Sequence, residues 1–263
     1  MLLQAMIVEA VELFMLVFVR MTGLFAVSPV FGRKNLPGYY KIGFAFFLAL
    51  IITGSNNIGV PATNGSMLEF AILLAKEFVI GVSIGFIPYL MFSCIYLAGQ
   101  LIDMKIGFSM VSVLDPVSNI QIPVTSNFYF MICMVIFVTL NAHHSIIRAI
   151  FTSYDIVPVG HIVINEYVIE NIVLLFADIF SVGFTIAAPI VFTILLTDVA
   201  LGVIAKAMPQ MNVFIVGMPL KILVGIIIII VTFPVMFLIL KELFGNIELE
   251  TINYMRGIGA GQS

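Results

Sequence analysis

The chain has 263 residues, of which 62% are hydrophobic and only 10% are charged, and its net charge at pH 7 is −3. Soluble domains carry about 25% charged residues, so this composition excludes an ordinary soluble globule. The mean hydropathy of +1.22 indicates an integral membrane protein, and the negative charge excludes a broadly basic nucleic-acid-binding surface. Cys94 and Cys133 lie in apolar runs without a CxxC motif, which predicts two buried apolar residues and no disulfide framework.

The first apolar segment, residues 1–31, is predicted to be a retained helix. Signal peptides carry positive charge before their apolar core, whereas this segment has Glu9 and Glu12 there and no A-x-A-like cleavage site near its end. Basic residues follow it at Arg33, Lys34 and Lys41. The positive-inside rule places that loop in the cytoplasm, the N-terminus outside, and the tail with Lys241 and Arg256 inside.

Long windows without charge follow along the chain, at residues 42–68, 78–102, 116–142, 179–197 and 222–240. About 20 apolar helical residues cross the hydrocarbon core. Continuous apolar runs at 78–90 and 222–231 favour helices over the alternating strands of a barrel. The Gly-, Asn-, Ser- and Thr-rich residues 53–66 predict a polar loop, which leaves a short second helix at 42–52.

Prolines stand inside four of these apolar stretches, at Pro88, Pro189, Pro219 and Pro234. Proline removes a backbone donor and kinks or breaks a helix. We therefore expect an all-α membrane protein of short, bent or broken helices and helical hairpins. Such breaks are tolerated where protein buries them or where they line an aqueous cavity.

Charges inside the apolar regions are candidates for function because a charge in lipid normally faces protein, water or a partner charge. Asp198, Lys206 and Lys221 interrupt the C-terminal third. They form either an ion relay or a positional set that marks a hairpin or pairs with a neighbouring subunit. The positional interpretation is preferred, since a relay needs several carboxylates or histidines at helical spacing. Gly81 and Gly85 form a GxxxG pattern that predicts close helix packing.

Three catalytic signatures are absent from the sequence: it contains no GxxxxGK[ST], HExxH or GxGxxG pattern. The adjacent His143 and His144 would point about 100° apart on a helix, so they make a poor metal pair and are predicted to cap the helix at 128–140. We expect no enzyme activity, no cofactor and no metal site.

The central stretch from Gly107 to Pro116 is unusual, because it combines apolar and β-branched side chains with turn-forming residues. This composition suits neither a solvated loop nor a spanning helix. An apolar, non-helical segment between helices is typical of a re-entrant loop or a pore constriction.

Three stretches resemble one known family. They are Arg20-Met21-Thr22-Gly23 with residues 28–32 and 36–37, residues 107–116 with Gln121-Ile122-Pro123, and residues 201–214 (LGVIAKAMPQMNVF) with Gly217-Met218-Pro219-Leu220-Lys221. The chain resembles the FliR family, the R subunit of the bacterial flagellar type III export gate, which is related to a component of virulence injectisomes. The resemblance covers nearly the whole chain.

The resemblance implies a non-enzymatic subunit that joins P and Q subunits in a helical assembly at the entrance of the export channel. It implies the bacterial inner membrane and the flagellar basal body as the location. The B switch protein, the A export protein, unfolded flagellar substrates and membrane lipid would be further partners, and nucleic acid would not. By the same resemblance, residues 1–160 are a P-like part and residues 161–263 are a Q-like helical hairpin with a C-terminal tail.

The resemblance also implies a plug at residues 106–122 that closes the channel at rest. Its members would be Gly107, Phe108, Met110, Val113, Leu114, Asp115 and Pro116. Phe108, Met110, Val113 and Leu114 would block the passage, and Gly107 and Pro116 would shape the loop. An ordinary interhelical loop is the alternative for this segment.

Two other functions compete with this one. A secondary transporter with discontinuous helices around a midplane site would show two similar halves, and no internal repeat is evident. An intramembrane enzyme would need a Ser–His, paired-Asp or metal constellation, for which Asp103 and Asp115 are too loosely framed.

Overall fold

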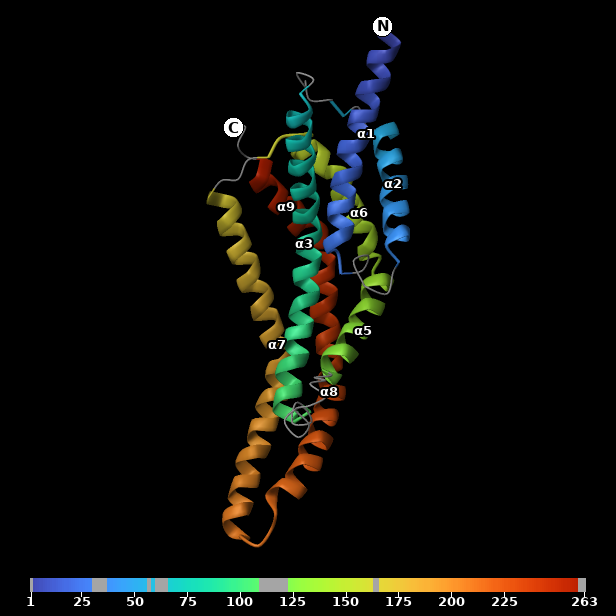
Figure 1. Cartoon of the computed structure of the whole chain (residues 1–263). Coiled ribbons are helices and arrows are strands. Elements are labelled where there is room, and N and C mark those ends of the chain that lie inside the picture. Colours follow the sequence, from blue (N-terminus) through green and yellow to red (C-terminus); the bar gives the residue numbers. More distant parts are fainter. Residues whose placement is uncertain are drawn as a thin grey trace. The chain divides into compact units, whose positions relative to one another are not determined.

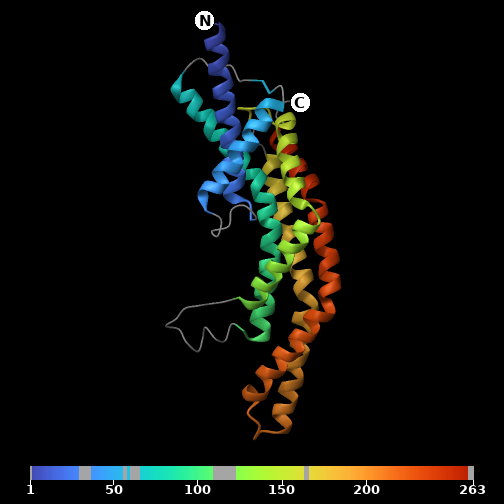
Figure 2. The same cartoon turned by 90° about the vertical axis from the view of Figure 1, so that its right-hand side faces the viewer.

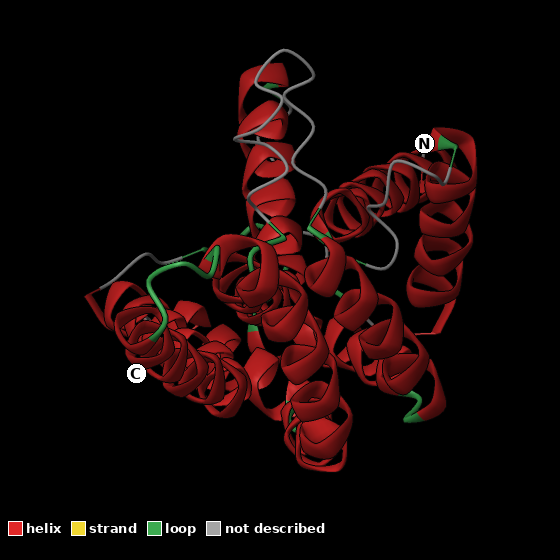
Figure 3. Ribbon diagram, turned by 90° about the horizontal axis from the view of Figure 1, so that it is seen from below, coloured by secondary structure: helices red, strands yellow, loops and turns green. Residues whose placement is uncertain are grey.

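The computed structural model describes residues 2–29, 37–55, 58–59, 66–108, 123–162 and 166–259. These residues form α-helices joined by turns and contain no strand (Figure 3). The helices are α1 (Leu2–Val27), α2 (Gly38–Ser55), α3 (Met67–Ile106), α5 (Val124–Thr139), α6 (Ala142–Ile156), α7 (Glu166–Ala207), α8 (Val213–Gly245) and α9 (Ile247–Gly259) (Figure 1). The predicted all-α class is confirmed.

Four helical segments are long and apolar enough to cross a membrane: Ile7–Val27, Met67–Ile106, Val168–Ala207 and Val213–Gly245. The helices α5 and α6 meet at a 65° bend and would form a fifth span if taken together, while α2 is a shorter apolar helix. By length and composition, the described part of the chain is therefore a membrane-embedded helical protein. The bend between α5 and α6 agrees with the expected bent helices.

The prediction of short or broken helices is wrong for α3, α7 and α8, which have 40, 42 and 33 residues. Pro88, Pro189, Pro219 and Pro234 all lie inside these helices. A proline removes one intrahelical hydrogen bond, and neighbouring groups in membrane helices can compensate for the loss. The apolar sequence continues without turn-forming residues on both sides, so the helix continues too.

The chain forms two compact units, each of which is built from segments distant in sequence. Unit 1 comprises Met1–Leu90, Asn141–Leu175 and Gly245–Ser263, and unit 2 comprises Met91–Leu140 and Phe176–Phe244. Each unit draws residues from both sides of position 160. The units therefore do not test the division into a P-like and a Q-like part, which stays a prediction.

In unit 1, α1 and α3 cross with their backbones in contact at three glycines. A Cβ atom added to Gly81 would collide with the carbonyl oxygen of Arg20, and one added to Gly85 would lie 2.7 Å from the carbonyl oxygen of Leu24. From the other side, a Cβ on Gly23 would lie 2.6 Å from the carbonyl oxygen of Phe78. Small residues one turn apart permit this approach, and α1 is the helix that contacts the GxxxG face.

The short helix α2 lies beside α1 in unit 1 (Figures 1 and 2). Aromatic rings join the two: the centroids of Phe14 and Phe46 are 5.2 Å apart, and those of Phe25 and Phe44 are 5.3 Å apart. The opposite face of α2 leaves large apolar side chains such as Tyr39 and Phe47 exposed. This face is suited to contact with lipid or with another protein.

The helices α6 and α9 pack against each other in unit 1. The last turn of α9 approaches the end of α6, where a Cβ on Gly259 would lie 2.6 Å from the carbonyl oxygen of Ile156. Earlier in α9, burial raises the pKa of the Tyr254 phenol, and a hydrogen bond with Ser83 of α3 lowers it by less. The C-terminal helix is thus fixed to both α6 and α3.

The prediction that His143 and His144 cap the helix at 128–140 is wrong. That helix is α5 and ends at Thr139, with Leu140 as its C-cap. Asn141 then adopts a left-handed conformation with φ +55°, and the chain starts a new helix there. The two histidines belong to the first turn of α6, where the backbone N–H of His144 donates to the carbonyl oxygen of Asn141.

Unit 2 has an aromatic core in which Phe92 of α3 contacts Phe130 and Phe137 of α5 and Phe244 of α8, with ring centroids 5.3–5.4 Å apart. Cys94 and Cys133 are buried free thiols, which confirms their prediction as buried apolar residues.

We predict that Gly81→Ala destabilises unit 1, because the new methyl group meets backbone atoms of α1 that cannot rotate away. Overpacking of this kind costs about 1–3 kcal/mol. Thermal unfolding of the purified protein in detergent, followed by circular dichroism, measures the effect. Gly43→Ala in α2 is the matched control, since a Cβ there meets nothing within 4 Å. Equal unfolding temperatures for the two variants would contradict the close crossing.

Candidate functional site

The predicted plug is described only at its first residues. Gly107 has φ +103° and its N–H donates to the carbonyl oxygen of Asp103 over 3.1 Å, which ends α3 with a left-handed residue. Phe108 follows and is half-buried. The other candidate plug residues lie outside the described residues: Met110, Val113, Leu114, Asp115 and Pro116.

The two ends of this segment are joined by Asp103, whose side chain is buried (3% exposed). The Asp103 carboxylate accepts a hydrogen bond from the backbone N–H of Thr125 at 2.9 Å and a longer one from that of Ser126 at 3.4 Å. These are N–H groups of the first turn of α5, whose own N-cap residue, Pro123, supplies no side-chain cap. A carboxylate at a helix N-terminus satisfies free donors and complements the helix dipole.

A second contact reinforces this connection between α3 and α5. A Cβ added to Gly99 would collide with the backbone of Ser126, and the Ser126 hydroxyl donates to the carbonyl oxygen of Tyr96 over 3.1 Å. The last turns of α3 and the first turn of α5 therefore form one rigid base. This base lies next to Phe108 and Pro123, the described residues that border positions 109–122 in the sequence.

From the sequence, Asp103 was considered only as a loosely framed candidate for a catalytic acid. The available signal was that α5 begins after Pro123 without a capping side chain of its own. A buried helix end without local caps needs a partner from another element, but the sequence does not say which residue supplies it.

A buried ion pair joins α1 and α3 in unit 1. The Nε of Arg20 donates to Glu77 Oε2 at 2.6 Å and its Nη2 donates to Glu77 Oε1 at 3.1 Å. Both side chains have no exposed surface. Two parallel N–H···O bonds between a guanidinium and a carboxylate give strong, oriented pairing.

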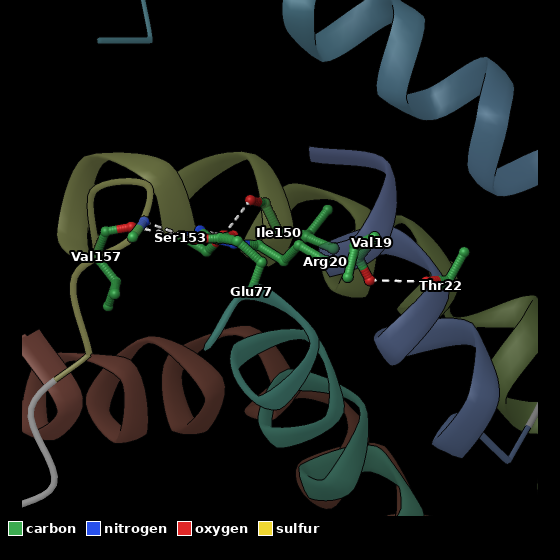
Figure 4. A network of polar contacts seen from close by, with 8 residues as sticks. Val19, Arg20, Thr22, Glu77, Ile150, Ser153 and Val157 are labelled. Atoms are coloured by element: carbon green, nitrogen blue, oxygen red, sulfur yellow. Dashed lines mark hydrogen bonds and ion pairs between the residues drawn. The ribbon is translucent and has the colours of Figure 1, made fainter. Parts of the chain in front are cut away.

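The remaining donors and acceptors of this pair contact α6 and the turn that follows it (Figure 4). Arg20 donates to the Ser153 hydroxyl at 3.0 Å and to the carbonyl oxygen of Val157 at 3.1 Å. Its guanidinium lies 4.1 Å from the centre of the Tyr154 ring. Glu77 accepts the backbone N–H of Gly160 at 2.8 Å. The two charges are therefore compensated by each other and by neighbouring polar and aromatic groups.

Arg20 enters the sequence argument only within the family resemblance, and Glu77 directly precedes the uncharged window at 78–102. Both stand out because each interrupts or borders a long apolar stretch, and they have opposite signs. Nothing in the sequence pairs two residues that are 57 positions apart.

The third candidate group lies on α7 and α8, which run side by side within unit 2 near the turn that joins them (Figures 1 and 2). Asp198 and Lys221 form an ion pair across these helices. Lys206 is exposed in the last turn of α7. The Asn212 side chain accepts the N–H of Phe214 and starts α8. A direct pair across a hairpin agrees with the positional interpretation of these charges.

No chemistry-bearing constellation joins these groups in the part of the chain that the structure describes. Among those residues, no group of three His, Cys, Asp or Glu could hold a metal ion. The arrangement fixes helices and the two ends of one segment of the chain.

We predict that Asp103→Ala weakens the start of α5, because it leaves two buried backbone N–H groups without acceptors. Each such loss costs about 1–3 kcal/mol. Hydrogen exchange of the peptide containing Thr125 and Ser126 should accelerate strongly in Asp103→Ala and less in Asp103→Asn, which keeps one acceptor oxygen. Asp178→Asn, an exposed site on α7, serves as the control. Unchanged exchange in Asp103→Ala would show that the carboxylate does not hold α5.

A second prediction separates the two interpretations of the hairpin charges. If the pair is positional, Asp198→Lys combined with Lys221→Asp preserves function, while each single change leaves like charges facing each other and reduces it. Swimming motility of a host complemented with each variant measures this. Loss of motility in the double variant, with normal protein levels, would favour a relay that needs its carboxylate on α7.

Comparison of the sequence with known proteins identifies a family to which this chain is similar. The sequence model of the family described as "Bacterial export proteins, family 1" matches residues 11–247. The flagellar biosynthetic protein FliR of Bacillus subtilis is 34% identical over 94% of this chain and 95% of its own length. The proteins of the same name from Escherichia coli and Aquifex aeolicus are 26% and 28% identical over 87% and 88% of both chains. The chain therefore belongs to the FliR family of bacterial flagellar export proteins.

Proposed function

We propose that this chain is a non-enzymatic subunit of the flagellar export gate, and that it completes the export channel and keeps it closed until an unfolded substrate arrives. Its family membership supplies the role in flagellar biosynthesis and export. The observation that carries the finer proposal is the rigid base made by Asp103, Gly99 and the first turn of α5. This base holds both ends of the apolar segment that the family resemblance implies is the plug.

An apolar segment closes a channel because ions and small solutes cannot shed their water inside it. Hydrophobic constrictions of this kind gate by excluding water. Phe108 begins such a constriction, and Met110, Val113 and Leu114 would continue it with flexible or branched side chains. The seal works only if its ends do not drift, which is the contribution of the Asp103 base. The energy for export would come from other components.

The P and Q subunits are the proposed neighbours in the assembly, with the B switch protein and the A export protein as further partners. The uncovered surface of the hairpin supports this. In the most apolar window of α8 only 11% of the residues are buried, against 61% in that of α3. Residues such as Phe214, Ile230 and Leu238 remain exposed on α8, and lipid or neighbouring subunits would cover them. The bacterial inner membrane and the flagellar basal body are the proposed location.

The transporter alternative loses its main support. It depended on helices interrupted by proline around a midplane site, whereas α3, α7 and α8 continue through their prolines. Flux of a small substrate through the isolated chain would be needed to restore it.

We predict that deleting residues 107–114 leaves the gate assembled and makes the membrane permeable to ions or small solutes. The reason is that the deletion removes the apolar blocking groups while Asp103 and α5 remain. Conductance of purified gates in planar bilayers measures the effect. A variant with the same number of Gly and Ser residues in place of 107–114 separates loss of apolar character from shortening, and it should leak as well. Unchanged conductance in the deletion would refute the plug role.

A further inference from the structure

The turn that follows α6 is held by side chains from two other helices. Residues 157–160 connect α6 to the segment that leads into α7, and Val157, Val159 and Gly160 are all buried. Gly160 has φ +82°, in the left-handed region that favours glycine. A buried turn of this kind carries backbone polar groups that need partners.

Those partners come from α1 and α3. The guanidinium of Arg20 donates to the carbonyl oxygen of Val157 at 3.1 Å. Glu77 accepts the N–H of Gly160 at 2.8 Å, and the ammonium of Lys76 donates to the carbonyl oxygen of the same Gly160 at 3.3 Å. Three charged side chains thus serve three backbone groups of one turn.

We propose that Arg20, Lys76 and Glu77 are positioning residues that fix the 157–160 turn, and that they thereby set where the chain leaves α6 during gate assembly. A buried ion pair is often replaced by apolar residues of similar volume without loss of stability. An apolar pair could not satisfy the backbone groups of the turn, and this is the specific property that the charges provide.

Position 160 is also the boundary at which the family resemblance divides the chain into a P-like and a Q-like part. If those parts contact different neighbours, the connection between them has to be fixed within this subunit. The expected loss of export rests on the proposed function. The expected change in hydrogen exchange at residues 156–162 does not depend on that function.

The test uses the full-length chain co-expressed with its gate partners. The double variant Arg20→Met with Glu77→Leu removes both charges and keeps apolar packing. We expect it to reach the membrane at the wild-type level, with hydrogen exchange in the 156–162 peptide faster by about tenfold, since the amide of Gly160 loses its acceptor. Export, measured by complementation, should decrease by at least about tenfold. Exchange at the Thr125–Ser126 base in unit 2 should not change and serves as an internal reference.

Arg148→Gln with Glu248→Gln is the matched control, because it removes another ion pair between helices of unit 1 that does not contact the turn. This control should leave exchange at 156–162 and export unchanged.

If the double apolar variant does not accumulate, Arg20→Lys gives the answer. It keeps a charge beside Glu77 but loses the planar fork that reaches Ser153 and Val157. Faster exchange at 156–162 with reduced export in Arg20→Lys supports the proposal. Wild-type exchange in the variant that accumulates overturns it, and so does normal export despite faster exchange. Absence of export with the wild-type chain, together with the exchange difference, would instead contradict the proposed function.

Discussion

The bidentate pair between Arg20 and Glu77 is the contact on which the architecture of unit 1 depends. Charges buried in an apolar protein are costly unless they are paired and hydrogen-bonded. Only one register of α1 against α3 brings the two groups together. The glycine crossing makes this register possible, because Gly81 lies one helical turn after Glu77 and touches the backbone of Arg20 itself. Ion pair and close crossing are therefore two parts of a single contact.

The same combination of a glycine and an acidic residue four positions apart recurs farther along α3. Gly99 touches the backbone of Ser126, and Asp103 accepts the N–H groups of the first turn of α5. In unit 1 the acidic residue binds a side chain of the neighbouring helix, whereas in unit 2 it caps the helix end. In both cases the glycine lets the backbones meet and the carboxylate fixes the register. One helix thus anchors two different partners by the same physical means.

Composition and hydropathy were enough to predict an all-α membrane protein. The scarcity of charge excludes a soluble domain, and the continuous apolar runs favour membrane helices over barrel strands. The sequence also singled out Gly81, Gly85 and the 107–116 stretch from local patterns. It did not reveal the pairing of Arg20 with Glu77 or the capping role of Asp103, since both depend on contacts between distant segments. The prediction of helices broken at proline failed for a different reason. A proline does cost a helix one backbone hydrogen bond, but a long apolar helix in a packed or lipid environment offsets that loss.

The burial of charged and apolar groups differs between unit 1 and the α7–α8 hairpin. The charged groups of Arg20 and Glu77 are hydrogen-bonded within the chain, and Arg20 is fully buried, as are Leu16 and Met21. On α8 most of the apolar surface stays uncovered, and the Asp198–Lys221 pair is only partly shielded. A hairpin with so little protein contact of its own can be stable where lipid or other subunits enclose it. Unit 1 thus compensates its buried charges internally, whereas the hairpin leaves most of its apolar surface to be covered by its surroundings.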